Sequence, residues 1–186
     1  MLWSDSNVYW NDTTHLHLRH IDYQSQPYAY VQLYSDLNGD QKPDLLVTVN
    51  DENNGSLIAY ELPPAGEIRT GKFIKHVLAS GFKPLVHAKG RGAPGQAAIL
   101  QYYSLTDRKK PILILSGDDD GCVYLLETVD DSDPNNWQYS SRIIYQSEKS
   151  TIGQLSVEDV DGDGHPELFI PVYNEGQVLI YRLVNN

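Results

Sequence analysis

Cysteine is nearly absent from this sequence, which limits how the fold can be held together. Cys122 is the single cysteine among 186 residues, so no intrachain disulfide framework is possible. Long hydrophobic runs are missing too, since no stretch approaches the ~18 consecutive apolar residues that suggest a membrane-spanning helix. Residues 1–5 have neither a basic region nor an apolar core and do not resemble a signal peptide. We therefore expect no membrane span.

Positive charge is also scarce. The chain has 14 Lys and Arg residues against 25 Asp and Glu residues, which gives a formal net charge of -11. Binding to a nucleic-acid backbone requires clustered Lys and Arg, so we expect no nucleic-acid partner. Much of the acidic excess lies in two short clusters, which suggests metal sites rather than a uniformly charged surface. Hydrophobic residues make up 40% of the chain, enough for a globular core at this length.

A repeated pattern dominates what is present. Three segments each contain an apolar run, a polar turn that ends in glycine, and a second apolar run. The first runs follow Pro43, Pro111 and Pro166, and the turns end at Gly55, Gly121 and Gly176. This pattern predicts three β-hairpins. Because the apolar runs are nearly continuous, we expect both faces of these strands to be buried.

Further strand-like segments flank each hairpin, so the repeating unit has four strands. They precede the hairpins at 28–34, 96–103 and 152–157, and follow the first two hairpins at 73–78 and 138–145. Four antiparallel strands in sequence order are typical of a propeller blade. The sequence thus predicts an all-β fold of about three β-propeller blades: 1–27 as an N-terminal segment, 28–80 as blade 1, 81–95 as an inter-blade loop, 96–150 as blade 2 and 151–186 as an incomplete blade 3.

The third unit ends before its fourth strand, whereas a spare outer strand at 15–21 precedes the first unit. Residues 19–21 resemble 75–77 and 141–143, which belong to the fourth strands of the first two units. This arrangement is expected where one blade is shared between the two termini, and equally where a longer array is cut. Propellers typically have ~4–8 blades. We therefore expect a partial propeller, completed by further blades of the same chain or of another chain.

Two acidic loops lie at matching places, between the first and second strands of units one and three. In each, oxygen-bearing side chains occupy positions 1, 3, 5 and 9, and the carbonyl at position 7 can add a ligand. Calcium takes ~6–8 oxygen ligands, and oxygen-only ligation favours it over zinc or copper. The predicted calcium ligands are Asp36, Asn38, Asp40, Lys42 and Asp44 in the first loop, and Asp159, Asp161, Asp163, His165 and Glu167 in the second, with Lys42 and His165 acting through their carbonyl groups.

Two other interpretations of these loops exist. An EF-hand needs flanking helices and a bidentate acid at the end of its loop, where Val47 and Ile170 stand here, so it does not fit. Plain Asp/Asn/Gly turns, favoured for backbone reasons alone, are the competing explanation. Unit two lacks the pattern: its loop 104–111 is basic, and we expect no calcium there. Its acidic run 118–120 lies in the hairpin turn, where we expect solvated side chains.

The acidic loops, the strand after each, and the tripeptide Gly92-Ala93-Pro94 resemble the FG-GAP/VCBS repeats of integrin α-subunit propellers and of many secreted proteins. The resemblance covers roughly residues 28–184; the basic loop of unit two and the low blade number depart from it. It implies calcium on one rim of a propeller, and a binding or scaffolding role for a protein or carbohydrate ligand outside the cell or in a secretory compartment. N-glycosylation sequons at Asn11 and Asn54 are compatible with a secreted glycoprotein.

Catalysis is the less favoured alternative. The sequence contains no nucleophile elbow, zinc-binding His-Glu-x-x-His motif or phosphate-binding glycine loop. A sugar-active lyase or dehydratase would use calcium to acidify a substrate proton, with His87, Lys89 and Arg91 as candidate groups beside it. The simpler interpretation places these three residues in an ordinary inter-blade loop. A fragment without a function of its own is the third alternative.

Overall fold

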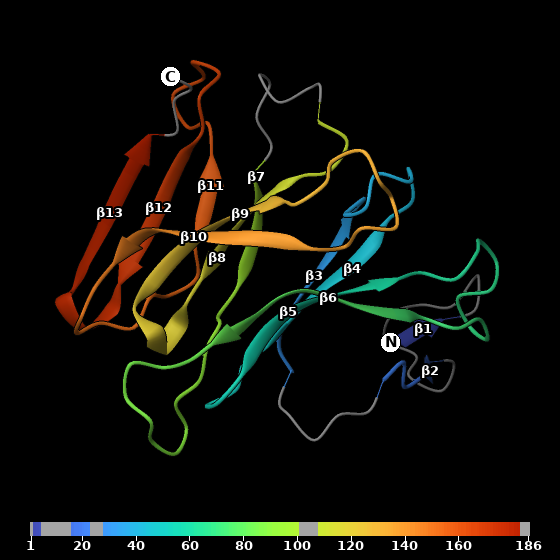
Figure 1. The fold of residues 1–186 in the computed structure, drawn as a ribbon, viewed down its shortest axis with the longest axis horizontal. Coiled ribbons are helices and arrows are strands. Elements are labelled where there is room, and N and C mark those ends of the chain that lie inside the picture. Colours follow the sequence, from blue (N-terminus) through green and yellow to red (C-terminus); the bar gives the residue numbers. More distant parts are fainter. Residues whose placement is uncertain (1, 5–15, 23–27, 101–107, 183–186) are drawn as a thin grey trace.

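The computed structural model shows an all-β protein (Figure 1). It describes residues 2–4, 16–22, 28–100 and 108–182. Within these ranges the regular structure is antiparallel sheet with two short 3-10 helices, and no helix is long and apolar enough to span a membrane. The strands form three sheets of three or four strands and one two-stranded sheet. The predicted all-β class is therefore confirmed.

The three larger sheets follow one another along the chain, and each strand pairs with its neighbours in the sequence. The first sheet contains β3 (Tyr28–Ser35), β4 (Asp44–Val49), β5 (Gly55–Glu61) and β6 (Ile74–Phe82). The second contains β7 (Ala97–Leu100), β8 (Ile112–Ser116), β9 (Cys122–Thr128) and β10 (Tyr139–Gln146). The third contains β11 (Ser156–Glu158), β12 (Glu167–Val172) and β13 (Gln177–Arg182). The predicted strand order within each unit is confirmed.

The central hairpins of the three sheets have the same register, as the repeat predicts. Equivalent cross-strand pairs are Leu45 with Tyr60, Leu113 with Leu126, and Leu168 with Tyr181. Two of the turns end in a left-handed glycine, Gly121 at φ 73° and Gly176 at φ 63°. A Cβ atom on Gly121 would also meet the carbonyl oxygen of Ser147 at 2.2 Å. Glycine is therefore required at this turn by backbone conformation and by space.

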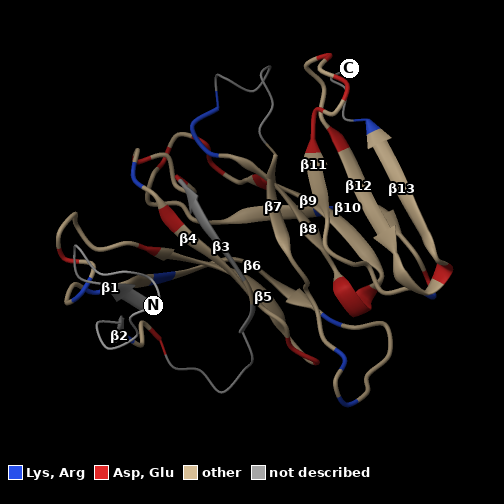
Figure 2. Cartoon of the chain, turned by 180° about the vertical axis from the view of Figure 1, so that it is seen from behind, with Lys and Arg blue, Asp and Glu red and all other residues tan. Residues whose placement is uncertain are grey.

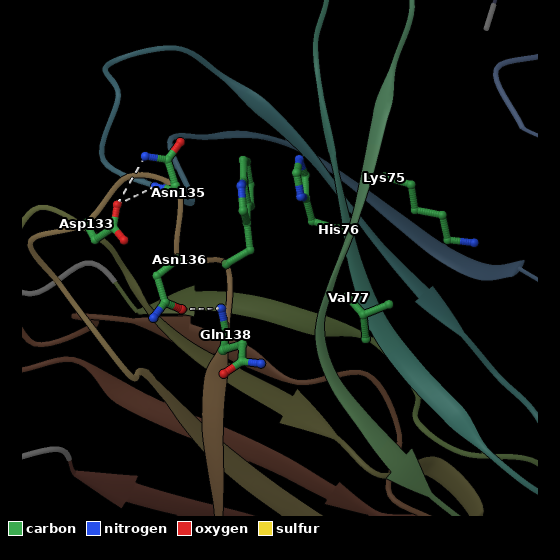
Figure 3. A pocket seen from close by; sticks show the side chains of 8 residues that line it. Lys75, His76, Val77, Asp133, Asn135, Asn136 and Gln138 are labelled. Atoms are coloured by element: carbon green, nitrogen blue, oxygen red, sulfur yellow. Dashed lines mark hydrogen bonds between the residues drawn. The ribbon is translucent and has the colours of Figure 1, made fainter.

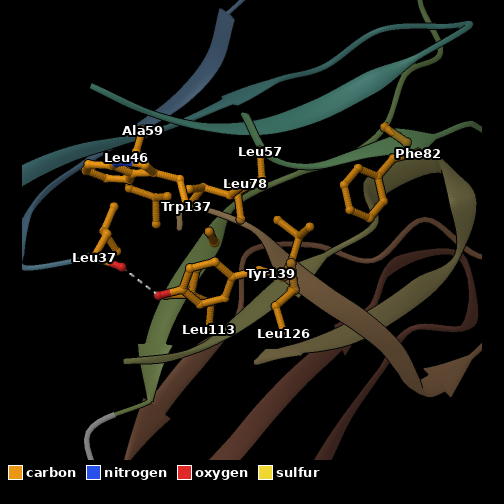
Figure 4. Packing of buried hydrophobic residues seen from close by; sticks show 13 residues of the cluster. Leu37, Leu46, Leu57, Ala59, Leu78, Phe82, Leu113, Leu126, Trp137 and Tyr139 are labelled. Atoms are coloured by element: carbon orange, nitrogen blue, oxygen red, sulfur yellow. Dashed lines mark hydrogen bonds between the residues drawn. The ribbon is translucent and has the colours of Figure 1, made fainter. Parts of the chain in front are cut away.

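Side chains of the inner strands alternate between two cores, because successive residues of a strand point to opposite faces. Leu113 and Leu115 of β8 pack into the core between the first and second sheets, whereas Ile112 and Ile114 pack into the core between the second and third. Figure 4 shows the first of these cores, in which Trp137 lies among leucines of both sheets. Every residue of β4 and β8 is buried, so the prediction of two buried faces is confirmed for these strands. It is wrong for β13, in which no residue is buried, because no described sheet covers that strand.

The two ends of this stack of sheets differ. The outer face of the first sheet forms a third core, in which Ile21 and Leu62 pack against residues such as Val47. On the third sheet, Val178 and Ile180 of β13 are 61% and 62% exposed. In the described part of the chain, β13 is also an edge strand of its sheet. An exposed apolar face beside a free edge is what an incomplete stack of sheets leaves.

Some boundaries differ from the prediction. β6 continues to Phe82, into the predicted inter-blade loop, because Phe82 pairs with Gly55 at the far end of β5. The strand expected at 96–103 is observed as β7 over 97–100, and its last residues lie outside the described ranges. In the third unit, Ile152 forms only an isolated bridge with Val172, and β11 is limited to three residues.

The spare N-terminal strand does not join the third sheet. Leu16–Leu18 form β2, which pairs with β1 (Leu2–Ser4) in a separate two-stranded sheet. The residues that follow β2 lie against the first sheet, where Ile21 enters the third core and Arg19 donates a 2.7 Å hydrogen bond to the carbonyl of Ile68. Within the described ranges no blade is shared between the two ends of the chain, because β2 pairs with β1 and the residues after it lie against the first sheet.

Shortening Leu113 to alanine should destabilise the fold, because this side chain is 0% exposed and lies between two sheets. We expect the free energy of unfolding to fall by ~2–5 kcal/mol, as measured by urea denaturation. The matched control is Leu85→Ala: its side chain is 47% exposed and the loss should stay below ~1 kcal/mol. Equal losses in the two variants would contradict the packing described above.

Candidate functional site

Both acidic loops lead into the second strand of their sheet. Residues 36–43 precede β4 and residues 159–166 precede β12. Figure 2 shows acidic residues, in red, where β4 and β12 begin. The last acid of each loop, Asp44 or Glu167, is the first residue of its strand. Strand pairing therefore holds these two carboxylates in place.

The two loops are shaped by the same hydrogen bonds; position 1 is Asp36 in the first loop and Asp159 in the second. This acid accepts the backbone N–H groups of positions 4, 5 and 6 over 2.6–3.1 Å. The side chain at position 3 accepts the N–H of position 5, and that at position 5 accepts the N–H of position 7. Positions 4 and 6 have positive φ in both loops, and position 6 is Gln41 in the first and Gly164 in the second. Two loops far apart in the sequence thus have one conformation.

The acid at position 9 is buried in both loops. Asp44 is 2% exposed and Glu167 is 7% exposed. Each uses one oxygen to accept the N–H of position 2, at 2.8 or 3.1 Å, and its other oxygen receives no hydrogen bond from the described residues. Burial raises the pKa of Asp44 to about 7, and the carboxylates of Asp40 and Asp36 add to the shift. A cation beside this group would favour its ionised form.

The acid at position 5 already has a cationic partner in each loop. The Nζ atom of Lys42 lies 2.9 Å from Oδ2 of Asp40. Arg182, at the end of β13, is ion-paired with Oδ2 of Asp163. Both pairs are exposed to solvent, so they contribute little to stability. A metal ion at either loop would compete with these side chains for the carboxylate.

The predicted ligands of the second loop converge more closely than spacing alone requires. Asp159, Asp161 and Glu167 each place a carboxylate oxygen within 4.8 Å of the other two. In the first loop position 3 is Asn38, which is 5% exposed, and among the described residues the acids Asp36, Asp40 and Asp44 do not form such a group. His165, like Lys42, offers its backbone carbonyl to such a site. This oxygen-rich set fits a hard cation such as Ca²⁺.

The surroundings of the two loops differ at position 2. Leu37 is 0% exposed in the core between the first two sheets, and its carbonyl accepts the hydroxyl of Tyr139 at 3.0 Å (Figure 4). Val160, at the same position of the second loop, is 62% exposed. The first loop is therefore anchored to the sheet that follows its own, and the second loop has no such neighbour among the described residues.

Unit two has a buried lysine where the other units have their acidic loops. Lys110 occupies position 7 of its loop and is 1% exposed. Its Nζ donates to the carbonyl oxygens of Asp130, Asp133 and Asn136 at 2.5, 2.7 and 2.7 Å, which satisfies all three ammonium protons. Burial lowers the pKa of Lys110, while the neighbouring carboxylates oppose that shift. Sequence reasoning missed this role, because its partners lie some twenty residues further along the chain.

The sequence predicts solvated side chains in the acidic turn of unit two, and the structure shows that this prediction is wrong for Asp120. Asp118–Asp120 form the 3-10 helix η3, and Asp120 is 4% exposed. Its carboxylate accepts the N–H of Cys122 and the hydroxyl of Tyr124, both at 2.7 Å. Burial raises the pKa of Asp120. Asp120 is buried and Asp118 and Asp119 are half-buried, because the turn lies where the connections between the three sheets meet.

Contacts from η3 reach the other two sheets. The carboxylate of Asp119 accepts from the guanidinium of Arg91 at 2.5 Å and from the hydroxyl of Thr151 at 2.9 Å. Oδ2 of Asp118 accepts from the side-chain amide of Asn50, just after β4, at 3.0 Å. Burial, followed by the charge of Asp119, raises the pKa of Asp118 to about 6. This turn thus ties the first, second and third sheets together.

The candidate groups for a lyase are engaged in ordinary contacts. Arg91 is ion-paired with Asp119, and Nδ1 of His87 lies 3.3 Å from the carbonyl oxygen of Glu52. Lys89 is exposed. These contacts favour the interpretation of the segment as a connecting loop.

No protein-family model, no curated protein and no solved structure matches this chain. The resemblance to FG-GAP/VCBS repeats therefore rests on the residues of the loops and hairpins described above, and family membership stays a prediction.

Replacing Lys110 by methionine should remove the ammonium while keeping most of the side-chain volume. Three carbonyl groups would lose the buried ammonium as their donor, so we expect a loss of ~2–4 kcal/mol in the free energy of unfolding. Urea denaturation measures this loss. The matched control is Lys109→Met, an exposed neighbour whose replacement should change stability by less than ~0.5 kcal/mol. If both variants unfold like the wild type, the three hydrogen bonds do not hold this part of the chain.

Cys122 should be inert toward thiol reagents while the protein is folded. It is 4% exposed, and burial together with the charge of Asp120 raises its pKa to about 11. At a pH near 8, only about one thiol in a thousand would then be ionised. Dithionitrobenzoate should react fully in denaturant and very slowly without it. Rapid labelling of the native protein would show that this turn opens readily.

Proposed function

We propose that this chain is a calcium-binding β-propeller module of the FG-GAP/VCBS type, which binds or scaffolds a protein or carbohydrate ligand outside the cell or in a secretory compartment. The observation that carries the proposal is the shared conformation of the two acidic loops, each with a buried acid that accepts a hydrogen bond from the described residues on only one of its two oxygens. Backbone turn formation accounts for the acid at position 1. It does not account for the carboxylates of Asp161 and Glu167, which converge on Asp159 in the second loop and repel one another without a cation.

In the proposed sites, one ion is held by each loop. The ligands are Asp36, Asn38, Asp40, Asp44 and the carbonyl of Lys42 for the first ion, and Asp159, Asp161, Asp163, Glu167 and the carbonyl of His165 for the second. Calcium would supply the positive charge that lets several carboxylates stay ionised side by side. Its role would be to hold each loop against the start of its strand.

Exposed apolar side chains on the third sheet support the propeller part of the proposal. Val178 and Ile180 are exposed on its face, and Val160 of the second acidic loop is exposed where Leu37 of the first is buried against the next sheet. A further sheet of the same kind, packed against the third, would cover all of these side chains. The proposed whole is therefore a larger propeller, with further blades from the same chain or from another one.

Calcium should raise the melting temperature of the protein relative to a sample with chelator. A ligand present at a hundred times its dissociation constant stabilises the folded state by about 2.7 kcal/mol per site. Titration calorimetry should show two ions per chain. Asp44→Asn and Glu167→Gln each remove one buried carboxylate, so each variant should bind one ion fewer.

The matched control for these variants is Glu52→Gln, which removes an exposed carboxylate outside both loops. It should bind two ions like the wild type. If calcium changes neither the melting temperature nor the heat of titration, the loops are plain turns and the proposal is wrong. If Glu52→Gln also loses an ion, calcium is held by overall negative charge rather than by the two loops.

A further inference from the structure

A polar groove of about 530 Å³ lies between β6 and the segment that leads into β10. It shares no residue with the acidic loops. Its volume is within the range of ~300–1,000 Å³ that is usual for small-molecule sites. Figure 3 shows His76 on one side and the side chains of Asp133, Asn135 and Asn136 on the other, with Gln138 below them.

A stacked pair of rings connects the two sides of the groove. The ring centroids of His76 and Trp137 are 3.9 Å apart and the ring planes differ by 5°. Trp137 is 8% exposed and belongs to the core between the first two sheets, so packing in that core holds the pair in place. Nε2 of His76 lies 3.4 Å from a carboxylate oxygen of Glu61. The two rings cover each other's facing sides and Trp137 is buried, so the open part of the pair is the ring of His76, whose side chain is 22% exposed. A fixed aromatic ring of this kind suits the C–H face of a sugar ring.

The polar side chains of the groove have unused hydrogen-bonding groups. Oδ1 of Asn136 accepts the N–H of Gln138 at 3.0 Å, which leaves its NH₂ group without an acceptor among the described residues. The side-chain amide of Gln138 makes no hydrogen bond to them. Oδ1 of Asp133 accepts the backbone and side-chain N–H groups of Asn135, and Oδ2 accepts no hydrogen bond from the described residues. Donors and acceptors are thus interspersed, as neighbouring hydroxyl groups require, since each hydroxyl both donates and accepts.

The segment that carries these groups is held before any ligand arrives. Nζ of Lys110 donates to the carbonyl oxygens of Asp133 and Asn136, which belong to the groove. Oδ1 of Asp130 accepts the N–H groups of Ser132 and Asp133. A site fixed in this way loses little conformational freedom on binding. This gives the buried lysine of unit two a role that neither acidic loop has.

Charge limits the class of ligand. The Nζ atom of Lys75, at the edge of the groove, lies 3.4 Å from a carboxylate oxygen of Asp22 and is therefore paired with an opposite charge. Among the described residues that line the groove, the other charged side chain is Asp133. Acidic sugars and phosphates would be repelled, whereas neutral hydroxyl groups would be accepted.

We propose that this groove binds a neutral carbohydrate, with a sugar ring against the His76–Trp137 pair and hydroxyl groups on the amides of Asn136 and Gln138 and on Asp133. The inference rests on the binding role proposed above and names the ligand class. A peptide is less favoured, because the groove offers no deep apolar pocket for an anchoring side chain.

The test uses Trp137 as the reporter. Trp3→Phe with Trp10→Phe leaves Trp137 as the only tryptophan of the chain. The probes are neutral gluco-, manno-, galacto-, xylo- and N-acetylglucosamine oligosaccharides, an oligogalacturonate as the acidic comparator, and a blocked peptide rich in asparagine. At least one neutral sugar should change the Trp137 fluorescence saturably, and shift its indole N–H signal in the NMR spectrum of the otherwise unchanged chain.

Asn136→Ala and Gln138→Ala should each weaken that binding by about tenfold, the effect of one lost hydrogen bond. The matched control is Asn53→Ala, an exposed amide in the β4–β5 turn, which should bind like the parent. Calcium titration of the same samples separates this inference from the proposed metal sites. If calcium binds but no neutral sugar does at millimolar concentration, the groove assignment alone is wrong.

Three other results would overturn the assignment as well. One is stronger binding of the oligogalacturonate than of any neutral sugar. Another is binding of the blocked peptide alone. The third is sugar binding that Asn136→Ala, Gln138→Ala and Asn53→Ala leave equally strong, because the sugar would then lie elsewhere.

Discussion

The structure depends on one constraint. Where a sheet is buried on both faces, the charged side chains that become buried at the ends of its strands need hydrogen bonds or an opposite charge. Asp44, Glu167, Asp120 and Lys110 are all buried at such ends. An ionised group in a poorly solvated place is unfavourable unless hydrogen bonds or an opposite charge compensate it. The lysine finds three carbonyl acceptors and Asp120 finds two donors. Among the described residues, Asp44 and Glu167 each accept one hydrogen bond, fewer than Lys110 or Asp120 makes.

The second unit differs from the first and third in how it compensates charge at the loop before its second strand. Its loop is basic and carries Lys110 at position 7, and the ammonium turns into the neighbouring segment before β10. That segment presents Trp137, which packs in the core on the inside and stacks on His76 at the surface. Packing between the first two sheets and the shape of the polar groove are therefore set by the same side chain. The same position in the repeat thus belongs to an acidic loop in units one and three and holds a buried lysine in unit two.

Local sequence signals predicted the elements well. The proline-to-glycine spacing identified the three hairpins, whose registers are equivalent, because turn chemistry and alternation along a strand act over a few residues. The spacing of the acidic loops predicted side chains that converge, and Asp159, Asp161 and Glu167 do so. The partners of Lys110 and of Asp119 were not predictable, because they come from segments that only the packing of sheets brings together. The pairing of β2 with β1 was not predicted either, for the same reason.

The sequence by itself determined the all-β class, the order of strands, the position of each turn and the conformation that the two acidic loops share. These features follow from interactions between residues close in the chain. Only the tertiary structure decided which charges are buried, how η3 joins three sheets, and that His76 and Trp137 meet at a groove. Burial and contact between distant segments are properties of the packed molecule, since a local pattern specifies a face of a strand but not the surface that covers it.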